Sequence, residues 1–148
     1  MGNNLKFNSS VCTTREQSQR LLNLGLKPET ADMVLIKELA YDEVAHCTYD
    51  ADTYMIRPID YLEGERHRGH IPSWSLHRLI ELLPQDIHLD DYEYTHYWLV
   101  IDPLKVIYKN SHSSWIYSCD EGGLYDKLIN TIEWTIKNNH FNKVYLKQ

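Results

Sequence analysis

The stretch from Pro72 to Phe141 decides the fold: PSWSLHRLIELLPQDIHLDDYEYTHYWLVIDPLKVIYKNSHSSWIYSCDEGGLYDKLINTIEWTIKNNHF. Its first part predicts an amphipathic helix over 74–83, because leucine and isoleucine recur there at helical spacing. Ser73 is the expected N-cap, and Pro84 ends the helix.

Strands and a second helix follow in the same stretch. Three segments rich in Tyr, Trp, Val and Ile predict strands over 97–101, 105–108 and 114–118, and their short connections favour an antiparallel meander. An apolar stripe through about four turns predicts a helix from about 123 to 139. The sequence therefore predicts an α+β fold, in which an antiparallel sheet of three or more strands packs against amphipathic helices in the order αβββα.

The first half of the chain is less regular. A capping box at Thr13 and Glu16 predicts a helix over about 14–24, which Gly25 ends. The run 33–36 fits either a strand or a helix.

Beyond that run, 53–56 fits a strand, and the rest of 41–69 reads as acidic, tyrosine-rich and loop-like. We expect the N-terminal helix and one or two of these strands to add to this α+β sandwich. The chain would then be a single domain over 1–148, made of a loop-rich segment 1–71 and an αβββα core over 72–141.

Bulk composition bounds the function. A chain of 148 residues buries about 70% of its unfolded surface, which is enough for a core without staples. The net charge is −6, from 15 basic and 21 acidic residues, so the basic footprint of a nucleic-acid binder is missing. The three cysteines lie far apart and no long apolar run is present, which predicts a soluble cytoplasmic protein with reduced thiols.

A helix-turn-helix DNA-binding regulator is one alternative. The segment 17–38 resembles that motif, with Gly25 at the turn, but it has Leu21 where the crossing helices need a small residue, and Ala31 where a branched one is usual. The basic residues available for phosphate contacts would be Arg15, Arg20 and Lys27.

A metal-dependent enzyme is the second alternative. His67 and His70 are three residues apart and are weak candidates for metal ligands, since Gly69 and Pro72 place them on a loop. No recognised zinc, phosphate-binding or nucleophile motif is present, so the prediction is no cofactor, no catalytic residue and no enzymatic activity.

The leading hypothesis is a non-enzymatic module that binds a protein, a second copy of itself included. On the last predicted helix Trp134 lies opposite the apolar stripe, among Lys127, Asn130 and Lys137. This position indicates either a partner contact, or a ring that lies flat over neighbouring side chains or is covered by the N-terminal helix. Trp74, on the polar side of its own helix, is a weaker candidate for the same role.

Short stretches of the chain resemble a known group of proteins. The words TADM at 30–33, PSWSL at 72–76 and LYDKLI at 124–129 are similar to small proteins encoded by phages, prophages and mobile elements of gut bacteria. The half from Pro72 onward resembles the phage α-β-α sandwich domain. This resemblance implies an accessory protein of a mobile element. The group has no assigned activity, so no functional residue is carried over.

Overall fold

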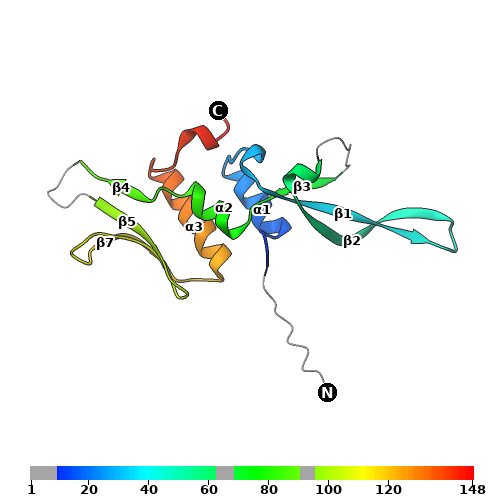
Figure 1. Cartoon of the computed structure of the whole chain (residues 1–148), viewed down its shortest axis with the longest axis horizontal. Coiled ribbons are helices and arrows are strands. Elements are labelled where there is room, and N and C mark those ends of the chain that lie inside the picture. Colours follow the sequence, from blue (N-terminus) through cyan, green and yellow to red (C-terminus); the bar gives the residue numbers. More distant parts are fainter. Residues whose placement is uncertain (1–9, 63–68, 91–95) are drawn as a thin grey trace, which may run out of the picture.

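The computed structural model describes residues 10–62, 69–90 and 96–148, and it has an α+β fold (Figure 1). Among these residues the helices and two antiparallel sheets follow one another in the order α1 (Arg15–Asn23), η1 (Pro28–Thr30), β1 (Met33–Asp42), β2 (Cys47–Pro58), η2 (Ile59–Leu62), β3 (His70–Ser73), α2 (Leu76–Leu82), β4 (Asp86–His88), β5 (His96–Ile101), β6 (Val106–Lys109), β7 (Trp115–Cys119), α3 (Leu124–Lys137) and η3 (Lys143–Tyr145). None of the described helices is long and apolar enough to cross a membrane.

The larger sheet has the strand order β4-β5-β6-β7, and every pair is antiparallel. The predicted meander is confirmed, and β4 is an edge strand that the sequence did not reveal because it is only three residues long. The helices lie on one side of this sheet (Figure 1). Between sheet and helices lies the main core, which includes Leu21, Trp74, Leu79, Val106, Leu128 and Ile132.

The smaller sheet has the order β2-β1-β3 and is separate from the larger one. The strands of the first half therefore form a sheet of their own and do not extend the C-terminal sheet. The run 33–36 is a strand, and 41–58, expected to be mostly loop, is a long hairpin. Strand β3 pairs only with Met33–Ile36, so the remainder of β1 and β2 forms a two-stranded ribbon.

Capping hydrogen bonds and one glycine turn determine where the helices begin. The capping residues lie one or two positions from those predicted from the sequence. Thr14 and Gln17 form the capping box of α1, which is a shift of one residue from the prediction. Ser75, rather than Ser73, caps α2, because Ser73 still belongs to β3. Gly122 has φ +78°, and a Cβ there would lie 2.9 Å from Asp126 Cβ, so this turn into α3 requires glycine.

Candidate interaction surfaces

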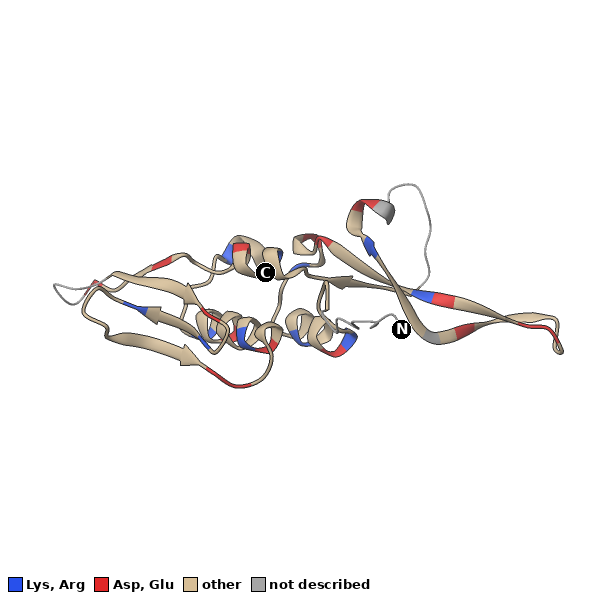
Figure 2. Ribbon diagram, turned by 60° about the horizontal axis from the view of Figure 1, so that its bottom comes forward, with Lys and Arg blue, Asp and Glu red and all other residues tan. Residues whose placement is uncertain are grey.

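The face of the larger sheet that points away from the helices is apolar at its centre. Side chains alternate along β5 and β6: Leu99 packs against the main core and Tyr108 stacks on Trp134 of α3, so both point towards the helices. The opposite side chains form what we call the outer face: Asp86, His88, His96, Trp98, Val100, Ile107, Lys109, Trp115 and Ser118. In the described parts of the chain no helix lies over this face (Figures 1 and 2).

Four of these side chains lie in register across the sheet. Asp86 on β4 is opposite Trp98 on β5, and Trp98 is opposite Lys109 on β6. Lys109 is opposite Trp115 on β7, where a shift of register between Tyr108 and Lys109 interrupts the regular alternation. Trp98 is 46% exposed and Trp115 is 63% exposed. The two tryptophans therefore flank a lysine on an open surface, where aromatic rings are typical of binding contacts.

The second surface is the two-stranded ribbon beyond β3, residues 37–54, which we call the arm. It projects from the helices at the end of the molecule opposite the larger sheet (Figures 1 and 2). A salt bridge joins Lys37 Nζ to Asp50 Oδ2 at 3.4 Å across the two strands. At the tip the Asp42 carboxylate accepts hydrogen bonds from the backbone N–H groups of Val44 and Ala45, which lower its pKa.

Large apolar and aromatic side chains of the arm face solvent. Leu39 and Tyr41 lie on one face of the ribbon, 70% and 58% exposed, and Tyr49 lies on the other, 53% exposed. Val44 at the turn is 92% exposed. A two-stranded ribbon with no core of its own is marginally stable, so these side chains contribute little to folding where they stand.

The predicted contact residue Trp134 does not lie on an open polar face. It is half-buried, its ring stacks on Tyr117 with centroids 4.7 Å apart, and Tyr108 and His140 lie at 5.8 and 5.5 Å. Burial raises the pKa of Tyr117 to about 12 and also raises that of Tyr108, so both phenols stay protonated at neutral pH. This aromatic group joins α3 to the inner face of the sheet.

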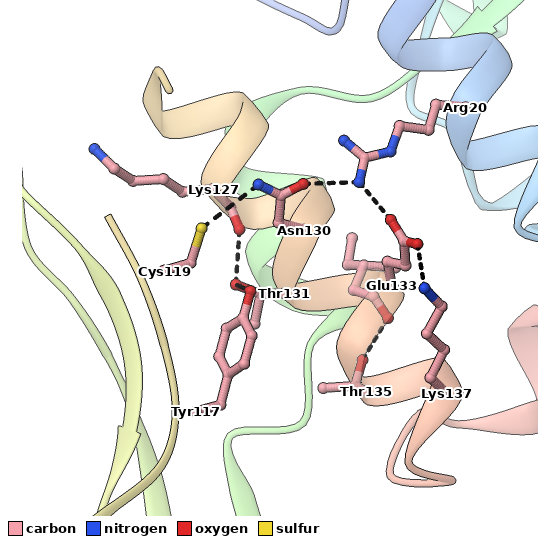
Figure 3. A network of polar contacts seen from close by, with 10 residues as sticks. Arg20, Tyr117, Cys119, Lys127, Asn130, Thr131, Glu133, Thr135 and Lys137 are labelled. Atoms are coloured by element: carbon pink, nitrogen blue, oxygen red, sulfur yellow. Dashed lines mark hydrogen bonds and ion pairs between the residues drawn. The ribbon is translucent and has the colours of Figure 1, made fainter. Parts of the chain in front are cut away.

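The residues predicted to surround Trp134 are divided among different environments (Figure 3). Lys127 is buried at 6% exposed, so a partner has little access to it, whereas Lys137 is exposed and donates to Glu133 at 2.6 Å. Asn130 accepts a hydrogen bond from Arg20 at 2.7 Å and contacts Cys119 Sγ at 3.5 Å. Helix α3 buries part of its polar face as well, because α1 packs on one side of it and strands β6 and β7 on another.

Trp74 is also not on the surface. Its side chain is fully buried, and Nε1 donates to Thr30 Oγ1 at 3.0 Å. The expectation that Trp74 lies on the polar side of a helix is wrong because α2 begins only at Leu76, which places Trp74 in the extended segment between β3 and the helix. No partner can reach this ring in the described conformation.

The basic residues proposed for DNA contact do not lie on a helix-turn-helix. After α1 the described chain continues with one 3₁₀ turn, η1, and then β1, so no recognition helix follows. Arg20 forms an ion pair with Glu133, and Lys27 Nζ donates to the Val144 carbonyl at 2.8 Å. Arg15 is exposed.

The histidine pair is only partly described. His67 lies outside the described residues, and His70 is exposed on β3. The described residues contain no group of three or more His, Cys, Asp or Glu side chains placed to hold a metal. Among the thiols, Cys12 is buried, and burial raises its pKa, which is the opposite of what a nucleophilic cysteine needs.

Neither the outer face nor the arm was predicted from the sequence. The outer face had a signal, because Trp98 and Val100 alternate with Leu99 and Ile101 along a strand that was itself predicted. The arm had a weaker one, since Tyr41 and Tyr49 stand in a stretch rich in Asp and Thr.

Comparison with protein-family models, with curated proteins and with solved structures found no match to this chain.

Proposed function

We propose that this protein is a non-enzymatic binding module that docks through its arm on a basic protein surface. The observation that carries the proposal is the combination of exposed apolar side chains and concentrated negative charge on one projecting ribbon. Neighbouring exposed apolar side chains with polar or charged residues around them are typical of interaction sites.

The charge of the arm is far from average. Residues 37–54 hold one lysine and five acids, a net charge of −4, out of −6 for all 148 residues. The acids are Glu38, Asp42, Glu43, Asp50 and Asp52. Such a field attracts a positively charged partner and accelerates its association, while it repels nucleic-acid phosphates.

The apolar side chains supply the contact itself. Leu39 and Tyr41 lie next but one to each other on the same face, and Val44 extends the surface to the tip. Tyrosine is among the residues that carry binding energy at protein interfaces. A partner with a recess for these groups and lysine or arginine at its rim fits both properties of the arm.

The sequence resemblance to proteins of phages and other mobile elements supports an accessory role in such an element, in the bacterial cytoplasm. Three free cysteines, Cys12, Cys47 and Cys119, agree with a reducing compartment.

A random peptide library tests the binding chemistry of the arm without requiring that its partner be identified. Panned against the immobilised protein, the library should enrich peptides that combine Lys or Arg with aromatic or aliphatic residues. The arm variant Leu39→Ser/Tyr41→Ser should lose this enrichment, because both anchors of one face are removed.

The matched control is Val144→Ser, which removes an exposed apolar side chain on η3, away from the arm. It should enrich the same peptides as the wild type. Equal enrichment by the arm variant, or peptides without a cationic bias, would contradict the proposal.

A further inference from the structure

We propose that the outer face of sheet β4–β7 is covered by the same face of a second copy of this chain. The outer face is a different surface from the arm, and its occupant does not depend on the arm's partner. Within the described residues, helices seal this sheet on its other side only (Figures 1 and 2).

The outer face has the composition of an interface centre. Ile107, between Val100 and Ser118 on the neighbouring strands, is only 6% exposed, and Trp98 and Trp115 on the same face have 46% and 63% of their surface in solvent. Tryptophan is the residue type most enriched among binding hot spots.

The order of side chains across the four strands is what points to a second copy. From β4 to β7 the row reads Asp86, Trp98, Lys109, Trp115. A two-fold axis parallel to the strands, between β5 and β6, places β5 of one copy over β6 of the other. Trp98 then lies over Lys109 of the second copy, and the reciprocal contact forms by symmetry.

These two contacts are favourable cation–π pairs, and the arrangement sets no two like charges against each other in this row. At the ends of the row Asp86 lies over Trp115 of the second copy, where the carboxylate stays at the solvent-exposed rim. The row is thus complementary to itself in one orientation of the two sheets.

Single-stranded nucleic acid is a less suitable occupant. Aromatic side chains on an open sheet do stack with bases, but such sites also track the backbone with several cations. Within this row Lys109 is the one cation, and Asp86 at the row's end, which contacts His96 Nδ1 at 3.0 Å, is an acid.

The size of the face predicts a weak association. Four strands about 4.8 Å apart and about five residues long span roughly 19 by 17 Å. The area of this face is well below the buried area of about 800 Å² per partner in a standard interface. We therefore expect a dissociation constant of about 10–500 µM rather than a permanent dimer.

Sedimentation velocity of the full chain from about 10 µM to 1 mM tests the inference, since it spans the expected dissociation constant. The wild type should shift from monomer to dimer over this range. Trp98→Lys should weaken association by about tenfold or more, because it sets the introduced lysine against Lys109 of the second copy in two places. The double variant Trp98→Lys/Lys109→Trp should restore association, since it recreates both pairs with their partners exchanged.

Val144→Lys is the control, because it replaces an exposed apolar side chain by lysine elsewhere and changes the net charge equally. It should dimerise like the wild type, and circular dichroism should show that all variants are folded. A wild type that stays monomeric at 1 mM, or a double variant that remains as weak as the single one, would overturn the inference.

Titration with single-stranded oligothymidylate, followed by tryptophan fluorescence, tests whether nucleic acid rather than a second copy binds the outer face. No quenching is expected for a face that binds a second copy. Salt-sensitive quenching that Trp98→Lys abolishes, in a protein that stays monomeric, would assign the face to nucleic acid instead.

Discussion

At the scale of single residues, Trp74 shows how one ring joins segments far apart in the sequence. Its indole lies within the main core, while its Nε1–H reaches Thr30 Oγ1 at 3.0 Å. Immediately beside it, the Ser75 N–H donates to Asp32 Oδ1 at 2.8 Å and the Trp74 N–H donates to Thr13 Oγ1 at 3.0 Å. These bonds fix the segment before α2 against Thr13 and against the stretch from Thr30 to Asp32.

Trp74→Phe should therefore lower the free energy of unfolding by about 1–3 kcal/mol, because it leaves a cavity and removes the hydrogen bond to the Thr30 hydroxyl. Urea unfolding followed by circular dichroism measures the change. The matched control is Trp115→Phe, at a ring 63% exposed, which should change the stability by less than about 0.5 kcal/mol. Equal losses for the two variants would show that Trp74 has no special structural role.

At the scale of elements, the sequence predicts best those segments that bury one face only. The stripe of α3 was expected from spacing, and Leu128, Ile129 and Ile132 are indeed fully buried. The burial of the other side of the helix was not expected, because Thr131 and Thr135 read as polar in any hydrophobicity pattern. They are fully buried all the same, and each satisfies its hydroxyl on a backbone carbonyl of its own helix.

The arm could not be predicted from the sequence because neither of its faces packs on a core. Both faces of β1 beyond Ile36 meet solvent, so no core imposes an alternation of apolar and polar residues. What marks the hairpin is local turn chemistry at Asp42, together with His46, which adopts φ +51°. The periodicity of apolar residues carries no information about either feature.

The contact between α1 and α3 gives a pH-dependent prediction. Glu133 accepts from Lys137 at 2.6 Å and pairs with Arg20, and these contacts lower its pKa. A lowered pKa means that the contribution to stability is present above the glutamate value of the unfolded chain, and is lost as the pH falls through the folded value.

Glu133→Gln should accordingly reduce the free energy of unfolding at pH 7 by about 0.5–1 kcal/mol, as for other partly exposed ion pairs. The difference from the wild type should shrink as the pH is lowered below about 4.5, the ordinary value of the group. Urea unfolding at a series of pH values checks this. Glu29→Gln, at an exposed acid on η1, should show no such trend, and a difference independent of pH would refute the ion-pair explanation.

At the scale of the whole molecule, the two candidate surfaces lie at opposite ends of an elongated shape, with the helices between them (Figure 1). A dimer formed through the outer faces would carry two arms. Two arms on one particle bind a repeated or dimeric partner with an effective concentration that a single arm lacks. Weak self-association at one end would in this way strengthen docking at the other.

This separation predicts that each surface can be removed without loss of the other. Lys37 and Tyr54 are paired across the ribbon, so Asn-Gly can replace residues 38–53 as a two-residue hairpin turn. The shortened chain should fold with a melting temperature within a few degrees of the wild type, because the main core contains no residue of the arm. It should still dimerise in sedimentation velocity but no longer bind cationic peptides, whereas Trp98→Lys should do the reverse. A shortened chain that fails to fold, or loses dimerisation as well, would mean that the arm is part of the core assembly and not an independent docking element.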